Sequence, residues 1–169
     1  TAIGNGAAVT TSNTIRLGNA NVTSIGGQVA WSVLSDGRVK KDVQQNAPGL
    51  DFVLGLRPVS YYIDRQKAVE LTMGSLYNAA NVGKMEADTE RHIGFIAQEV
   101  DALIKEKKLP FDVVDRSAEN GQVFGLRYSL FVVPLINAVQ EQQNQIDLLL
   151  QKVEKLKAAL EAKTVSTNQ

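Results

Sequence analysis

The clearest pattern of hydrophobic positions lies at the C-terminal end, where apolar residues recur at alternating spacings of three and four. This is the pattern of a coiled-coil seam, because a helix packed on its own domain would drift off a strict seven-residue repeat. We therefore predict a helix over 129–164 that pairs with other chains, followed by a frayed tail at 165–169. The alternative is an amphipathic helix packed on its own domain. The predicted seam positions are Val132, Leu135, Val139, Gln142, Ile146, Leu149, Val153, Leu156 and Leu160.

Residues 35–128 carry short apolar runs of both helical and strand period, which predicts a small α+β unit. Helical spacing predicts one helix over 50–56, which Pro58 stops, and another over 98–105. Residues 36–43 are expected to form a short helix or turn, and residues 64–91 a partly helical insertion. The predicted strands are 59–63, 93–96, 111–114 and 123–128, with a turn at 119–121 between the last two.

Residues 1–34 alternate short β-type runs with turn residues, and Arg16 is their only charged side chain. The predicted strands are 13–19 and 21–27. Such a segment offers too narrow an apolar edge to bury a core of its own, so its strands need partners from neighbouring repeats or other chains. We expect the end of a three-chain β stalk here. A flexible linker rich in Gly, Thr and Asn is the alternative.

Charge and composition narrow the classes of partner. Lys and Arg number 18 and so do Asp and Glu, so the chain has no electrostatic footprint for nucleic acid or an anionic membrane. The absence of cysteine excludes disulfides and thiolate metal sites, and the single histidine excludes a site with several histidines. No apolar run approaches the ~20 residues that span a bilayer. We expect no metal, no cofactor, no nucleic-acid partner and no membrane, and a start at Thr1 that lies within a longer protein.

Candidate chemistry begins where the first two segments meet. A serine hydroxyl, Ser35, and a lysine amine, Lys40, stand five residues apart. Serine is a weak nucleophile unless a base takes its proton, and lysine is a base only where burial or a nearby cation keeps it neutral. Arg38 and Lys41 are close enough in sequence to supply that repulsion. From the residues alone, two solvated loop residues are the simpler interpretation, since such pairs occur in most proteins.

Four sequence blocks follow one another in a specific order. They are SDGRVK at 35–40, GLDFVLGLRPVSY at 49–61, HIGFIAQEV at 92–100 and YSL at 128–130. In this order they resemble the endosialidase-type intramolecular chaperone and auto-peptidase domain of phage tail spikes and tail fibres. The resemblance runs from about Leu34 to about Lys155. It implies a domain that drives the folding of a trimeric fibre and then cuts itself off before the serine of the first block.

Carried over to this chain, the resemblance implies that Ser35 is the nucleophile, Lys40 the general base and Leu34–Ser35 the scissile bond. The expected architecture is α+β and an intertwined homotrimer, with a β stalk segment at 1–34, a mixed α/β chaperone core at 35–128 and the coiled-coil helix. Partners are then other copies of the chain and the upstream fibre of the same chain. The expected location is a phage fibre or spike precursor assembled in the host cytoplasm, or a bacterial surface fibre.

Two other functions remain open on the sequence. The same fold would also serve as a non-cleaving trimerisation cap, or as a receptor-binding tip in which residues 64–91 contact a host surface. Among supporting residues, Asp36 is expected to cap the turn that positions Lys40. Glu99 is either close to the serine and lysine or a helix-start carboxylate favoured by the helix dipole. Gly94 is expected where two segments approach closely, and His92 to pack or hydrogen-bond at a strand start.

Overall fold

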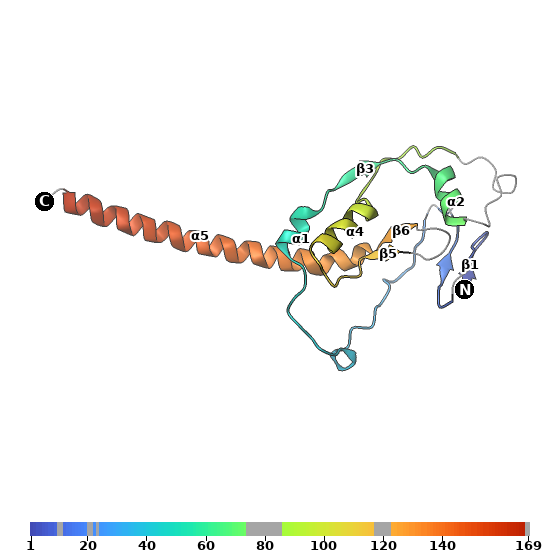
Figure 1. The fold of residues 1–169 in the computed structure, drawn as a ribbon, viewed down its shortest axis with the longest axis horizontal. Helices are drawn as coiled ribbons and strands as arrows, with labels where there is room; N and C mark the ends of the chain where they lie inside the picture. Colours follow the sequence, from blue (N-terminus) through green and yellow to red (C-terminus); the bar gives the residue numbers. More distant parts are fainter. Residues whose placement is uncertain (10–11, 20–21, 23, 74–85, 117–122, 168–169) are drawn as a thin grey trace.

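The computed structural model describes residues 1–9, 12–19, 22, 24–73, 86–116 and 123–167, and it has a mixed α/β body with a long C-terminal helix (Figure 1). Short strands and helices gather in the body, and the last helix extends away from it. In chain order the elements are β1 (Ala2–Ile3), β2 (Arg16–Leu17), η1 (Gly37–Val39), α1 (Leu50–Gly55), β3 (Val59–Tyr61), α2 (Arg65–Met73), β4 (His92–Gly94), α4 (Ala97–Glu106), β5 (Val114–Arg116), β6 (Phe124–Leu126), η3 (Tyr128–Phe131) and α5 (Val132–Thr167).

The described strands form three separate two-stranded sheets. β1 and β2 are parallel, whereas β3 pairs with β4 and β5 with β6 in antiparallel register. The β3–β4 pair places Tyr61 opposite His92, so it closes the base of the excursion between these two residues. Two-stranded sheets of this size are marginal on their own and depend on packing against helices.

The hydrophobic core lies between α1, α4, the β5–β6 hairpin and η3, which leads into α5. Phe52 from α1 is at its centre, edge-on to Phe111 at 5.6 Å between ring centroids and stacked on Phe131 at 6.3 Å. Val100 and Ile104 cover it from α4. Aromatic pairs in these geometries add to the stabilisation that burial alone provides.

Polar contacts fasten α1 to the first turns of α5. The Glu141 carboxylate accepts a hydrogen bond from the Leu50 backbone N–H at 2.8 Å, and so caps a helix whose own N-cap residue, Gly49, has no side chain. A Cβ at Gly49 would collide with that carboxylate, which explains the glycine. Asn137 also donates to the Ala47 carbonyl at 2.8 Å. These contacts therefore anchor the long helix to the body through its N-terminal turns.

The apolar stripe along α5 is exposed to solvent. All nine predicted seam positions are exposed in the single chain, from Val132 to Leu160. The predicted helix is confirmed, but it begins at Val132 and not at 129, because Tyr128–Phe131 form η3. It continues to Thr167, beyond the predicted end at 164, while residues 168–169 lie outside the described residues. None of the helices in the described part of the chain combines the length and the apolar character needed to cross a bilayer.

Most predicted helices are confirmed, whereas several strand boundaries were wrong. The helices predicted at 50–56 and 98–105 correspond to α1 and α4, residues 36–43 contain the short turn η1, and the insertion contains α2. The strand predicted at 59–63 is β3, and the one at 123–128 is β6. The turn predicted at 119–121 lies outside the described residues.

The strand boundaries that were wrong have different causes. The run 111–114 contributes to the core, and its ladder begins only at Val114. The strand predicted at 93–96 is shifted to His92–Gly94, because the Phe95 N–H donates to the Tyr128 hydroxyl and not to a neighbouring strand. Of the run 13–19 only Arg16–Leu17 is a strand, and the described residues of 21–27 form none.

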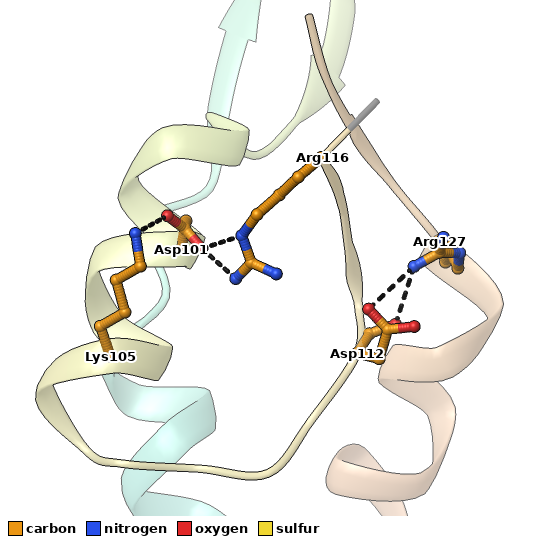
Figure 2. A network of polar contacts seen from close by, with 5 residues as sticks. All are labelled: Asp101, Lys105, Asp112, Arg116 and Arg127. Atoms are coloured by element: carbon orange, nitrogen blue, oxygen red, sulfur yellow. Dashed lines mark hydrogen bonds and ion pairs between the residues drawn. The ribbon is translucent and has the colours of Figure 1, made fainter. Parts of the chain in front are cut away.

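A buried carboxylate joins α4 to the β5–β6 hairpin (Figure 2). Asp101 is 5% exposed and accepts from Lys105 Nζ at 2.7 Å and from Arg116 Nε at 2.8 Å. Across the hairpin, Arg127 Nη1 lies 3.1 Å from Asp112. Hydrogen bonds from Lys105 and then Arg116 hold the pKa of Asp101 below its ordinary value. Such a buried charge is stabilising only while both partners remain in place.

This network predicts a loss of stability in acid. Because the pKa of folded Asp101 is lowered, its contribution is fully present above the ordinary aspartate value of 3.8 and is lost as the pH falls through the folded value. We expect Asp101→Asn to lower the urea midpoint at neutral pH, and the gap from wild type to close below about pH 4. Asp147→Asn, which removes an exposed carboxylate on α5, is the control. A gap that stays constant down to pH 3 would contradict this role.

Candidate active site

The serine and lysine singled out by the sequence lie in direct contact. Lys40 Nζ donates a hydrogen bond to Ser35 Oγ at 2.9 Å, and both side chains belong to the same chain. Both residues are exposed. They flank η1, the small turn that Figure 1 shows in the blue-to-cyan segment, away from the helices of the body.

A short capped turn returns Lys40 to Ser35. Asp36 is the N-cap of η1, and its Oδ1 accepts from the Arg38 backbone N–H at 2.9 Å. Two backbone bonds close the turn, from Val39 N–H to the Asp36 carbonyl at 3.1 Å and from Lys40 N–H to the Gly37 carbonyl at 3.2 Å. The predicted capping by Asp36 is therefore confirmed.

The Arg38 guanidinium turns toward Asp36. Its Nη2 lies 2.6 Å from Asp36 Oδ2, and its Nε donates to Oδ1 at 3.0 Å. These hydrogen bonds hold the pKa of Asp36 below its ordinary value. One of the two cations that the sequence suggested as a source of repulsion for Lys40 is thus paired with a nearby carboxylate.

Hydration governs what the Ser35–Lys40 pair can do. A lysine amine in water is almost wholly protonated at neutral pH, and a protonated amine can donate to a hydroxyl but cannot accept its proton. General-base catalysis by Lys40 requires that burial disfavour the charged form. In this structure the two side chains are in contact, and both are exposed to solvent.

An apolar strip directly precedes the candidate scissile bond. Val29, Trp31 and Val33 recur at every second position and are 84%, 86% and 86% exposed, and Leu34 follows at 78%. Their spacing of two is typical of one face of a β-strand. No strand was predicted at 28–34, although this alternation is visible in the sequence. We refer to Val29, Trp31, Val33 and Leu34 as the pre-cleavage strip.

Glu99, the carboxylate of the third sequence block, pairs with Arg57 and not with Ser35 or Lys40. Glu99 lies in the first turn of α4 and accepts from Arg57 Nε at 3.0 Å, which lowers its pKa. No hydrogen bond or ion pair joins it to Ser35 or Lys40 in the described residues. Its place at the helix start agrees with the dipole alternative. Sequence reasoning missed Arg57, whose only signal was its place in the block at 49–61.

The glycine of the same block lies at a close approach, as predicted. A Cβ on Gly94 would collide with the Tyr128 hydroxyl oxygen, and it would lie 3.2 Å from that of Tyr61. The Tyr128 hydroxyl also accepts from the Phe95 N–H at 3.0 Å. The third block is thereby fastened to the entry of the terminal helix.

The predicted hydrogen bond of His92 is confirmed as well. His92 Nε2 lies 2.9 Å from Asp88 Oδ2, a carboxylate that also accepts from the Ile63 backbone N–H at 2.8 Å. Asp88 thus ties together the two ends of the excursion after β3. Among the described residues, no group of three or more His, Asp or Glu side chains is arranged to hold a metal ion.

Comparison with known protein families assigns the segment that begins at Ser35. Residues 35–109 match the model of a peptidase family described as chaperone of endosialidase. Residues 35–109 are therefore similar to a chaperone of endosialidase domain, in agreement with the resemblance that the four blocks suggested. The match ends at 109, earlier than the predicted limit near Lys155. No curated protein matches the chain in a sequence comparison.

The Gly94 contact predicts a steric effect at this block. We expect Gly94→Ala to destabilise the domain by about 1–3 kcal/mol, because the added methyl group forces the Tyr128 hydroxyl to move. Gly37→Ala, where a Cβ meets nothing within 4 Å, should change stability by less than about 0.5 kcal/mol. Urea unfolding of both variants measures the difference.

A compensating variant makes this test specific. Tyr128→Phe removes the oxygen that meets the new methyl group, so the double variant should recover part of the loss. If Gly94→Ala and Gly37→Ala had equal effects, the close approach would not explain the glycine.

Proposed function

We propose that this chain is the C-terminal chaperone of a trimeric fibre or spike, and that it releases itself by cleavage of the Leu34–Ser35 bond. The observation that carries the proposal is the hydrogen bond from Lys40 to Ser35 at the first residue of the family match. The proposed setting is a phage fibre or spike precursor in the host cytoplasm, or a bacterial surface fibre. The proposed partners are two further copies of the chain and the fibre upstream.

The proposed reaction is an acyl shift followed by hydrolysis. Ser35 Oγ attacks the Leu34 carbonyl carbon while its proton passes to neutral Lys40 Nζ. The C–N bond then breaks, Lys40 returns the proton to the departing Ser35 amine, and an ester joins Leu34 to Ser35 Oγ. Water hydrolyses this ester, leaving a Leu34 carboxylate and a free Ser35 amine and hydroxyl. No oxidant, metal or cofactor takes part in this scheme.

Assembly is the proposed trigger of the reaction. The nine exposed seam residues of α5 form a stripe that a three-stranded coiled coil would cover. The pre-cleavage strip is equally unpartnered, and packing it into the end of a β stalk would bring neighbouring chains beside Lys40. Loss of water around the amine would favour its neutral form, so cleavage would follow correct assembly. A fibre without its chaperone would then be held by kinetic stability.

A non-cleaving trimerisation cap is the second candidate function. The exposure of Ser35 and Lys40 supports it, since an amine that stays hydrated after assembly would never become a base. Both candidate functions require a trimer, and they differ only in whether the Leu34–Ser35 bond is cleaved. A receptor-binding tip remains a prediction, because residues 74–85 of the insertion lie outside the described residues.

The two dyad residues should be individually required. We expect the wild-type chain to divide between Leu34 and Ser35, while Ser35→Ala and Lys40→Ala stay whole and still form trimers. Intact mass gives the cleavage, and native mass gives the assembly. Ser32→Ala and Lys67→Ala change an exposed serine and an exposed lysine outside the pair and should cleave like wild type. A wild-type trimer that stays whole would favour the non-cleaving trimerisation cap over the self-cleaving chaperone.

The contact within one chain further predicts that each chain cleaves itself. We expect no cleavage when Ser35→Ala and Lys40→Ala chains are co-folded into mixed trimers, because no chain then carries both groups. A peptide tag of distinct mass on one variant identifies the mixed species by native mass. Product at Leu34–Ser35 of the Lys40→Ala chain would show that lysine acts on a neighbouring chain.

A further inference from the structure

We infer that Arg38 is a positioning residue for the Ser35–Lys40 pair, which it aligns by clamping the Asp36 carboxylate across the turn between them. This inference rests on the proposed self-cleavage. It assigns to Arg38 a role other than that of a nearby positive charge, which was the role that the sequence suggested.

The clamp consists of four hydrogen bonds from Arg38 to Asp36, with Gly37 between them in the sequence. Arg38 Nε donates to Asp36 Oδ1 at 3.0 Å and to Oδ2 at 3.1 Å, and Nη2 donates to Oδ2 at 2.6 Å. The same Oδ1 accepts from the Arg38 backbone N–H at 2.9 Å. Arginine can do this because its guanidinium is a planar fork, which a lysine amine cannot reproduce.

The turn needs such support because little else holds it. η1 spans three residues, contains no buried side chain and closes with the two backbone bonds described above. Short 3-10 segments have poor hydrogen-bond geometry, and a single isolated turn is unfavourable in water. Lys40 is the C-cap residue of η1, so a looser turn would move its Nζ away from Ser35 Oγ. A misplacement of about 1 Å can slow a reaction strongly.

The clamp should matter to the reaction and not to the fold. The Arg38 side chain is 89% exposed, and exposed ion pairs contribute little to global stability. Removing it leaves the core of α1, α4 and α5 untouched. A loss of cleavage with unchanged unfolding is therefore the signature of positioning, whereas a structural residue would change both.

The test is the cleavage rate of assembled trimers, followed by intact mass from neutral to alkaline pH. We expect Arg38→Ala to cleave about tenfold more slowly at every pH, with the midpoint of the pH–rate curve unchanged. Arg38→Lys should recover only part of the rate, since it restores charge without the fork. Lys67→Ala, which breaks another exposed ion pair, with Glu70 on α2, is the matched control and should cleave within about twofold of wild type.

A double variant isolates the clamp from other effects of either residue. Asp36→Asn keeps an oxygen able to cap the Arg38 N–H but loses the ion pair. If the two residues act as one unit, the Asp36→Asn/Arg38→Ala chain should be no slower than the slower single variant. Native mass and urea unfolding of each variant verify that trimers and folds are intact.

Three results would overturn the inference, and they are distinguishable. Wild-type rates in Arg38→Ala would reject the clamp while leaving the dyad in place. A pH–rate midpoint moved to higher pH with an unchanged plateau would show that Arg38 acts as a cation on Lys40. A wild-type trimer that never cleaves would reject the proposed function and the positioning role together.

Discussion

Lys40 Nζ lies within hydrogen-bonding distance of Ser35 Oγ and yet remains in water, and the reactivity proposed for the domain depends on these two facts. The short capped turn brings the groups together inside one chain. Water keeps a lysine amine charged, so contact alone does not make it a base. In our proposal the missing factor is dehydration, which a single chain does not provide and an assembly does. In this proposal, the contact between Lys40 and Ser35 already exists in the single chain, and the dehydration of Lys40 follows on assembly.

Elsewhere, the chain presents two exposed apolar surfaces. The helix α5 is fastened to the body through Glu141 and Asn137 and carries an apolar stripe beyond that anchor. The pre-cleavage strip carries a second one beside the candidate bond. If copies of the chain cover both, the first gathers the chains and the second closes around the site. Cleavage would then report on correct assembly.

Features set by local sequence could be predicted, and features set by distant partners could not. The seven-residue repeat predicted α5, and apolar spacing predicted α1 and α4, because helical periodicity is a local property. The cap by Asp36 and the close approach at Gly94 were also found from motifs. The β5 boundary was missed because Phe111 and Val113 pack in the core while the ladder starts at Val114. The Arg57–Glu99 pair joins residues far apart in sequence, and no local signal marks it.

The most direct test of the account breaks the seam without touching the site. The double variant Ile146→Asp/Leu149→Asp places charges at two seam positions, while Asn144→Asp/Gln151→Asp places them on the same helix away from the seam. Native mass and intact mass would be recorded for both and for wild type. The account predicts a seam variant that is monomeric and whole, and a control that is trimeric and divided at Leu34–Ser35. A monomeric seam variant divided at that bond under native conditions would contradict the dependence of cleavage on assembly.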